Sequence, residues 1–526
     1  MLILLFTASI MALDIHQGEL HFNSDEMRHA FTGVFMRDLM VDRPGHPIGY
    51  AYMYYAKYPA LGVPHWPPLF YVVEGFFFLL LGISVVTSRV VILLFALMGI
   101  AFFYGIAAQF GSRYRALLAA LIMPLMPYML LYERATMLEI PMIAMCLATL
   151  YFWLRFLATD RGVHLWATAV FLAGALLTSQ KSAVLVPIIV LHFFAEGRWR
   201  LLLRWQVWAA GAASVALVAP WYWLTARTAA LAVERVTGAG MTHTAQYEHW
   251  LFYPYLLQRQ VGLKMMLLGV AGLSWTMLFA RQKYRFLLIW VLCTYVFFSL
   301  LPEKDLRHTM IWIPPIVYLS LLAIEVLLAR RRWAILAGIV LALNTAYHAL
   351  YYDRPRLSGV EAAAKFISEQ PDSDLVYYQG HLNGNFIFYT RKYDPHKTRM
   401  VAREKQIRAT RIVDQFGSVQ IISTPEQVVD LFRTWGIRYA VIQDREAEAG
   451  LAPVRQALAT PAFQHVAVFT ITSTVPEANN QRIDVYRYVG AIERTKGQVV
   501  IPMLTLRDHI RADLSRLVGR PWPNEE

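Results

Sequence analysis

Residues 88–110 read SRVVILLFALMGIAFFYGIAAQF, an almost unbroken apolar stretch close to the ~20 residues that a helix needs to cross a bilayer. Backbone groups in lipid must find hydrogen-bond partners within their own segment, so such a run is predicted to be a helix. Runs of this kind recur along the chain, and we predict spans near 1–13, 88–110, 116–131, 137–158, 163–178, 181–195, 206–224, 261–280, 284–301, 309–329 and 333–351.

Composition supports the same class of protein. The 526 residues are 57% hydrophobic and 16% charged, against roughly 25% charged residues in soluble domains. The net charge of +13 is concentrated in arginines of short loops between apolar runs, which indicates membrane topology and not a nucleic-acid partner. Cys146 and Cys293 both lie inside apolar runs, so neither a disulfide framework nor a cysteine metal site is expected. The run 1–13 has no basic segment before it and is interpreted as a signal-anchor whose beginning precedes this start, not as a cleaved signal peptide.

The apolar run 67–84 decides the number of crossings. Prolines at its start and Glu74 within it favour a membrane-embedded or surface helix, and whether the run crosses is left open. If it does not cross, five basic clusters share one side, which the positive-inside rule makes cytoplasmic. They are Arg113/Arg115, Arg155/Arg161, Arg198/Arg200/Arg204, Arg281/Lys283/Arg285 and Arg330/Arg331/Arg332. The prediction is an α-helical polytopic membrane protein with about 11–12 spans.

After Tyr352 the chain becomes mixed polar and apolar. Helical spacing over 359–367 and 425–435 alternates with strand-like segments near 375–378, 438–442, 466–472 and 483–488. We therefore divide the chain into a transmembrane domain, 1–352, and a C-terminal soluble α/β domain, 353–526. Under the favoured topology the second domain is extracytoplasmic.

An acidic pair follows the first apolar run, in Ser24-Asp25-Glu26-Met27-Arg28. A carboxylate can take a proton from a hydroxyl or amine nucleophile, and a guanidinium can hold a phosphate with paired hydrogen bonds. The pair with Arg28 therefore suggests group transfer from a lipid phosphate at the membrane surface. The alternative is a solvated loop that caps a helix.

Two further charged motifs fall on the same predicted side. Glu139 begins a predicted span. Placing an ionisable side chain in a bilayer is unfavourable, by about 2.5–3.5 kcal/mol at the bilayer centre, so a functional role is the default interpretation of such a residue. Lys304 and Arg307 are one helical turn apart and can face one anion. A structural pair with Arg134 is the alternative for Glu139, and plain snorkelling is the alternative for the two cations.

Aromatic and imidazole side chains offer weaker signals. His65 and Trp66 lie in a proline- and aromatic-rich stretch, 58–71, which fits either an interfacial belt or stacking on a sugar. His243, Glu248 and His249 could ligate a metal together with His65, but the spacing is non-specific and a surface role is favoured. The sequence leaves open whether a divalent metal bridges the carboxylates.

In this order the motifs resemble the GT-C superfamily of polyprenyl-phosphate-dependent glycosyltransferases, in particular the lipid A aminoarabinose transferase and protein O-mannosyltransferase branches. The matching pieces are Asp25-Glu26-x-Arg28, Pro67-Pro68-Leu69-Phe70-Tyr71, Leu138-Glu139-Ile140-Pro141, Leu177-Thr178 before Lys181, Pro220-Trp221-Tyr222, and Lys304-x-x-Arg307-His308 before Pro314-Pro315. In the aminoarabinose branch a Glu-Lys pair usually stands where this chain has His65-Trp66.

The resemblance implies that Asp25 is the catalytic carboxylate, with Glu26 beside it. Arg28, Lys304 and Arg307 would contact the donor phosphate, and Glu139 would be the second acidic residue, with His65 and Trp66 assigned to the acceptor site. The implied function is an inverting transfer of a sugar from a polyprenyl-phosphate donor to a lipid, glycan or protein acceptor at the outer face of the cell membrane. A transporter or flippase of a lipid-linked solute, or an oligosaccharide ligase, is the alternative. No cofactor besides the possible divalent metal is implied, and no Gly-x-Gly-x-x-Gly nucleotide fingerprint is present.

Overall fold

The computed structural model describes residues 2–20, 24–237, 247–301, 303–410, 418–443, 451–493, 498–503 and 508–523. The chain forms two compact units. Unit 1 contains Met1–Ile15, Val63–Phe70 and Arg89–Asp353, and unit 2 contains His16–Gly62, Tyr71–Ser88 and Arg354–Glu526. The second unit thus combines the C-terminal residues with two earlier segments of the chain. The division at residue 352 into a transmembrane and an extracytoplasmic domain stays a prediction.

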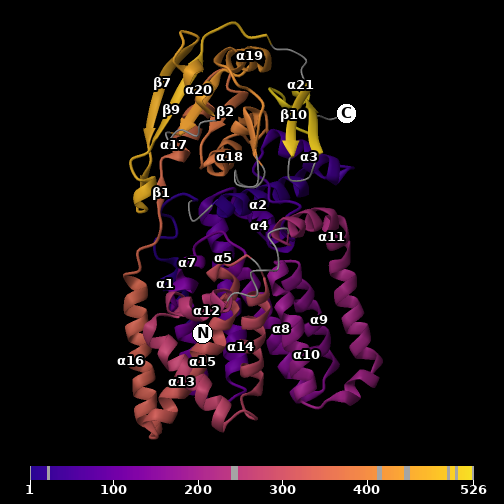
Figure 1. The fold of residues 1–526 in the computed structure, drawn as a ribbon, viewed down its shortest axis with the longest axis vertical. Helices are drawn as coiled ribbons and strands as arrows, with labels where there is room; N and C mark the ends of the chain where they lie inside the picture. Colours follow the sequence, from indigo (N-terminus) through magenta and orange to yellow (C-terminus); the bar gives the residue numbers. More distant parts are fainter. Residues whose placement is uncertain are drawn as a thin grey trace. The chain divides into compact units, whose positions relative to one another are not determined.

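Unit 1 is helical (Figure 1). Its helices are α1 (Leu2–Ala12), α5 (Val85–Ala107), α6 (Arg113–Ile122), α7 (Pro127–Tyr132), α8 (Glu139–Thr159), α9 (Gly162–Leu176), α10 (Leu185–Ala195), α11 (Trp205–Thr237), α12 (Tyr247–Val261), α13 (Leu263–Phe279), α14 (Arg285–Leu300), α15 (Ile313–Leu328) and α16 (Arg331–Leu350). Short 3-10 turns join several of them: η1 (Met123–Leu125), η2 (Gln180–Val184), η3 (Trp199–Leu203) and η5 (Leu306–Trp312). The long helix α11 runs beside α9 (Figure 1).

Five described segments are long and apolar enough to cross a membrane: Val85–Ala107, Glu139–Thr159, Trp205–Ala226, Leu306–Leu328 and Arg331–Leu350. Five shorter apolar helical segments accompany them, and α4 (Leu69–Leu81), within the run 67–84, is one of these. At ~1.5 Å per residue its 13 residues reach about 20 Å, less than the ~30 Å hydrocarbon core. The polytopic, helical class is confirmed, while the number of crossings stays a prediction.

The predicted span 116–131 is wrong as a single helix. It is divided into α6, the turn η1 and α7. Pro124 lies inside η1 and Pro127 is the first residue of α7. A proline in a helix interior lacks the N–H donor and clashes with the preceding turn, so these two residues end one helix and start the next.

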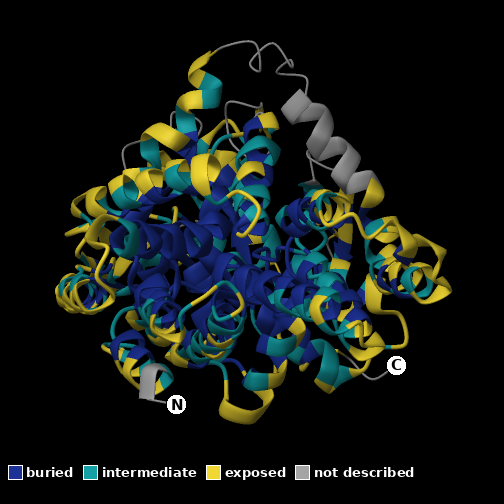
Figure 2. Ribbon diagram, turned by 90° about the horizontal axis from the view of Figure 1, so that it is seen from below, coloured by how far each residue is buried: buried dark blue, intermediate teal, exposed yellow. Residues whose placement is uncertain are grey.

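Helix packing within unit 1 relies on small residues. Gly269 and Gly272 of α13 face α15, and a Cβ atom on Gly272 would clash with the carbonyl oxygen of Leu319. Glycine therefore allows α13 and α15 to approach closely, as is common in membrane helices. Viewed from below, buried residues gather in the middle of the picture and exposed ones at its rim (Figure 2).

Unit 2 is built on a five-stranded sheet in the order β3 (Met400–Arg403), β2 (Leu375–Gln379), β6 (Tyr439–Gln443), β9 (Arg482–Tyr488) and β7 (Phe463–Thr470). β2 pairs in parallel with β3 and β6, whereas β9 pairs antiparallel with β6 and β7. The predicted strands and helices of this region are confirmed, including α17 (Val360–Glu369) and α19 (Pro425–Trp435). The remaining elements are β1 (Leu357–Ser358), α18 (Asn383–Lys392), η6 (Glu404–Gln406), β4 (Arg408–Thr410), β5 (Ser418–Gln420), α20 (Ala452–Leu458), β8 (Thr472–Ser473), η9 (Pro476–Ala478), β10 (Gln498–Met503), β11 (Asp508–Asp513) and α21 (Leu514–Leu517).

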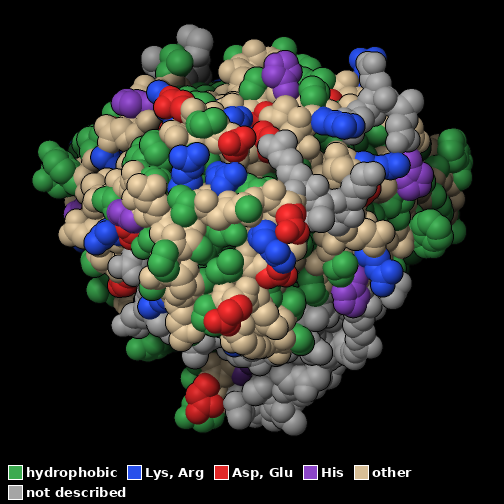
Figure 3. All heavy atoms as spheres, turned by 90° about the horizontal axis from the view of Figure 1, so that it is seen from above, with side chains coloured by type: hydrophobic (Ala, Val, Ile, Leu, Met, Phe, Trp, Pro, Cys, Tyr) green, Lys and Arg blue, Asp and Glu red, His purple; other side chains and the backbone are tan. Residues whose placement is uncertain are grey.

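Two helices from early in the chain, α2 (Ser24–Asp42) and α3 (Pro47–Lys57), complete unit 2. The apolar side chains of α2 recur with helical spacing and are all nearly inaccessible: Met27, Ala30, Phe31, Val34 and Phe35. At the end of α2, the Asp38 carboxylate receives two hydrogen bonds from the Arg391 guanidinium of α18, each 2.8 Å long. On the face seen from above, basic and acidic side chains of the described residues are interspersed (Figure 3).

Candidate functional site

Three charged side chains from separate segments of unit 1 meet at the start of α8. Glu139 is the first residue of α8 and is 3% exposed. Lys181 Nζ lies 3.2 Å from Glu139 Oε1, and Arg307 Nε lies 3.8 Å from the same oxygen. We call Glu139, Lys181 and Arg307 the charge cluster. Arg134, the expected alternative partner, donates hydrogen bonds to the carbonyls of Met11 and Ile10.

The second carboxylate oxygen of Glu139 is buried. Within the part of the chain that the structure describes, this Oε2 atom has no hydrogen-bond partner. Buried polar atoms nearly always have one, so an exception needs an explanation. An oxygen in this position is suited to accept a hydrogen bond from a hydroxyl or amine of a bound molecule.

Capped 3-10 turns position the two cations of the charge cluster. Asp305 caps η5, where its Oδ1 accepts the backbone N–H of Arg307 at 3.0 Å and its Oδ2 lies 2.8 Å from Arg307 Nε. Ser179 caps η2 by accepting the N–H of Lys181. The side chains of Lys181 and Arg307 remain 26% and 18% exposed. Both are therefore held in place yet accessible to a ligand.

Lys304 is directed elsewhere. Its Nζ donates hydrogen bonds to the carbonyls of Phe298 and Ser299, at 3.0 and 2.7 Å, and lies 5.3 Å from the centre of the Tyr253 ring. The expected helical turn between Lys304 and Arg307 is not formed, because Asp305 between them is extended and η5 begins only at Leu306. Desolvation lowers the pKa of Lys304 to about 8.

The segment with His65 and Trp66 runs along the segment that leads to Lys181. Gln180 Nε2 donates to the His65 carbonyl at 2.8 Å, and the Leu69 N–H donates to the Leu177 carbonyl at 2.9 Å. The His65 and Trp66 rings meet edge to face with their centres 4.8 Å apart. Lys181 is a weak candidate in the sequence, because its partner Glu139 is 42 residues away and no local spacing links the two residues.

In unit 2, Asp25, Glu26 and Arg28 lie in the first turns of α2. Glu26 is buried and Asp25 is half-buried. Burial lowers the pKa of Arg28, the neighbouring Arg403 lowers it further, and Asp25 opposes both effects. Asp25 and Arg28 thus lie within electrostatic reach of each other. Acidic residues in the first turn also stabilise a helix through its dipole, so a structural contribution is expected in any case.

The described residues contain no group of three or more His, Cys, Asp or Glu side chains that could hold a metal ion. His249 Nε2 lies 2.7 Å from the Ser299 carbonyl oxygen. His243 lies outside the described residues. The described residues therefore give no support to a metal held by His65, Glu248 and His249.

Comparison with known proteins adds a family match over part of the chain and a similar fold. Residues 65–223 match the model of the dolichyl-phosphate-mannose-protein mannosyltransferase family. No curated protein matches the chain in sequence. The structure of ArnT from Cupriavidus metallidurans bound to undecaprenyl phosphate is similar, with 15% identity, 94% of this chain and 99% of that chain covered, and a TM-score of 0.61.

Two further structures share the fold. The apo form of the same ArnT has 14% identity and a TM-score of 0.62, covering 92% of this chain and 97% of that one. Archaeal AglB from Archaeoglobus fulgidus, in complex with an inhibitory peptide and a dolichol-phosphate, has 12% identity and a TM-score of 0.53, covering 84% and 69%.

The chain as a whole thus has a fold similar to those of ArnT and AglB, and residues 65–223, less than half of the chain, match a family of sugar transferases.

Proposed function

We propose that this protein transfers one sugar from a polyprenyl-phosphate donor to an acceptor of the cell envelope, at the outer face of the cell membrane. The charge cluster carries the proposal. Two accessible cations flank a buried carboxylate whose second oxygen has no hydrogen-bond partner among the described residues. Such an arrangement suits a phosphate on one side and a hydroxyl or amine on the other.

The comparisons support the donor class. The similar ArnT structure is bound to undecaprenyl phosphate, AglB is in complex with a dolichol-phosphate, and the matching family is named for a dolichyl-phosphate-mannose donor. The family name mentions a protein, the AglB title an inhibitory peptide and the ArnT title no acceptor, so lipid, glycan and protein acceptors all stay open for this chain.

In the proposed reaction Asp25 takes a proton from the acceptor nucleophile. The nucleophile forms a bond to the anomeric carbon as the bond from that carbon to the phosphate oxygen breaks, and the sugar is inverted. The sequence resemblance assigns Arg28, Lys304 and Arg307 to stabilising the charge that develops on the leaving lipid phosphate. Of these, Arg307 shares the charge cluster with Lys181, whereas Lys304 donates to the Phe298 and Ser299 carbonyls and contributes through its charge. Glu26 and Glu139 orient the acceptor, and His65 and Trp66 contribute to its binding.

A transporter or flippase of a lipid-linked solute is the main competing function. Transporters commonly place broken helices at the membrane midplane, whereas the charge cluster here lies at the first residue of α8 and in two turns between helices. An oligosaccharide ligase differs in its donor, a lipid-linked polymer. An assay with purified protein in liposomes distinguishes these functions. Labelled donor is supplied, and sugar transfer and lipid flipping are measured separately. Transfer of a single sugar supports the proposal, and flipping without transfer rejects it.

Arg307→Gln is expected to weaken donor binding. A hydrogen bond to a charged group contributes about 1.5–3 kcal/mol, so the Kd for polyprenyl phosphate should rise about tenfold to hundredfold. Binding of the lipid phosphate to purified protein measures this directly. Arg113→Gln is the matched control, because Arg113 is exposed at the start of α6 in the same unit. Equal losses in both variants would contradict a specific role for Arg307.

Donor binding should also weaken as the pH rises through 8. With a pKa of about 8, the charged fraction of Lys304 falls from about nine-tenths at pH 7 to about one-tenth at pH 9. The KM for donor should therefore rise over this interval in the wild type. In the Lys304→Arg variant the side chain keeps its charge over this interval, so the KM for donor should not change with pH. A rise of the same size in Lys304→Arg would show that another group titrates.

A further inference from the structure

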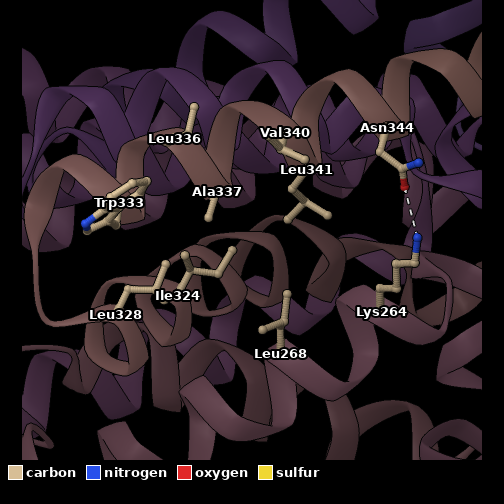
Figure 4. Close-up of a pocket in the computed structure, with 10 residues that line it drawn as sticks. All are labelled: Lys264, Leu268, Ile324, Leu328, Trp333, Leu336, Ala337, Val340, Leu341 and Asn344. Carbon is tan, nitrogen blue, oxygen red and sulfur yellow. Dashed lines mark hydrogen bonds between the residues drawn. The ribbon is translucent and has the colours of Figure 1, made fainter.

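An apolar groove lies in unit 1 between α13, α15 and α16. It has a volume of about 680 Å³. Figure 4 shows Trp333 and Leu328 at one end and Lys264 and Asn344 at the other, with Ala337 pointing into the space between them. None of these residues belongs to the charge cluster or to the motifs discussed above.

The groove follows from the sizes of the residues around it. The glycines of α13 draw that helix tightly against α15, whereas α16 presents the small Ala337 to the space beside them. On the groove wall, Trp333 is 49% and Val340 is 57% exposed. Since α13, α15 and α16 are apolar helices of a membrane protein, hydrocarbon is the environment that suits these walls.

The two ends of the groove differ in chemistry. Lys264 Nζ lies 3.3 Å from Asn344 Oδ1, and the described residues that line the groove include no carboxylate. This end therefore offers a cation and an amide, which complement an anionic phosphate. The opposite end carries the Trp333 ring, and the wall between them is apolar.

The length of the groove indicates the size of its occupant. Trp333 and Asn344 are eleven residues apart on α16, which corresponds to about 16 Å at ~1.5 Å per residue. One leaflet of a bilayer with a ~30 Å hydrocarbon core is about 15 Å deep. The groove thus accommodates an acyl chain of a single leaflet, whereas a polyprenyl chain would extend far beyond it.

We propose that this groove binds an anionic glycerophospholipid, with an acyl chain along Ala337 and the phosphate at Lys264 and Asn344. The site is separate from the proposed donor site and takes a lipid that is not a substrate. This proposal does not depend on the proposed transfer reaction.

Native mass spectrometry of the full-length protein in detergent tests the proposal, with dioleoyl phosphatidylglycerol and dioleoyl phosphatidylcholine as probes. Wild type should retain phosphatidylglycerol in preference to phosphatidylcholine. Lys264→Gln should reduce that preference about fivefold, since a lysine near anionic lipid contributes about 1 kcal/mol. Ala337→Trp should abolish retention of both lipids by filling the groove.

Matched controls are Lys283→Gln, an exposed lysine between α13 and α14, and Ala271→Trp, an exposed alanine of α13 outside the groove. Both should behave as wild type. Equal retention of the two lipids by wild type, or an unchanged preference in Lys264→Gln, would overturn the proposal. So would displacement of phosphatidylglycerol by equimolar polyprenyl phosphate in wild type. If Ala337→Trp does not fold, the Lys264→Gln comparison still decides.

Discussion

Asp25→Asn is expected to lower the kcat for sugar transfer by about 10²–10⁴-fold, the usual contribution of a general base. Asparagine keeps the size of aspartate and its ability to accept a hydrogen bond, but it cannot take a proton at neutral pH. The KM for donor should change little, because the donor phosphate is assigned to other side chains. Initial rates at saturating donor measure the effect.

The control for this variant is Asp353→Asn, which removes an exposed carboxylate that has no assigned role. Asp353→Asn should transfer at the wild-type rate. Because Asp25 lies in the first turn of α2, the thermal stability of Asp25→Asn must also be compared with that of wild type. A variant with unchanged kcat would remove Asp25 from the mechanism, and one with lost stability alone would assign it a structural role.

Arg391→Met is expected to cause the largest loss of stability. Arg391 is 2% exposed and Asp38 is inaccessible, and Tyr54 also donates to Asp38 at 2.7 Å. Burial alone would raise the pKa of Asp38, but the Arg391 guanidinium more than offsets this and the pKa lies below its usual value. Removing the guanidinium leaves a buried charge without compensation, which costs about 3–5 kcal/mol.

A loss of this size corresponds to a decrease in Tm of roughly 6–20 °C for a unit of this size. Arg433→Met is the matched control: its ion pairs with Asp430 and Glu493 are exposed, and such pairs contribute about 0–1 kcal/mol. The account of unit 2 would be contradicted if the two variants had the same Tm. Since α2 carries both Asp38 and Asp25, Arg391→Met should also reduce transfer.

Elements with a strong local pattern could be predicted from the sequence. The predicted span 137–158 corresponds to α8, the predicted span 333–351 corresponds to α16, and the predicted helix 425–435 corresponds to α19. α19 has the signals expected of a helix start and end, with a capping box at Thr424 and Gly436 in a left-handed conformation after its last residue. Hydrophobic periodicity and capping residues are local, so one sequence suffices to recognise them.

The arrangement of α2 was missed, although its apolar residues repeat with helical spacing. From the sequence, the acidic pair is a candidate site, with a solvated loop that caps a helix as the alternative, and no helix is predicted over 24–42, although a helical pattern begins at Met27. That α2 belongs to the same compact unit as the C-terminal strands could not be read from any pattern. The Asp38–Arg391 pair joins residues 353 positions apart, and such contacts are set by the fold as a whole.

The contacts of the candidate site could not be predicted from the sequence either. The cost of an ionisable group near a membrane segment points to Glu139, and the spacing of Lys304 and Arg307 suggests that they face one anion, yet the partners of these three residues are not predictable from the sequence. The structure pairs Glu139 with Lys181 and turns Lys304 toward backbone carbonyls. The roles of Asp25, Glu26 and Arg28 stay predictions from the sequence resemblance.

The most direct test of the central claim is a donor assay in membranes that carry the wild-type protein or Asp25→Asn at matched expression. A panel of labelled polyprenyl-phosphate monosaccharides is supplied together with lipid and protein extracts of the cell envelope. The account predicts that wild type moves label from one donor of the panel to an acceptor and that Asp25→Asn does not. If wild type binds polyprenyl phosphate but transfers no monosaccharide from any donor, and instead moves a lipid-linked oligosaccharide or only flips the lipid, the account is contradicted.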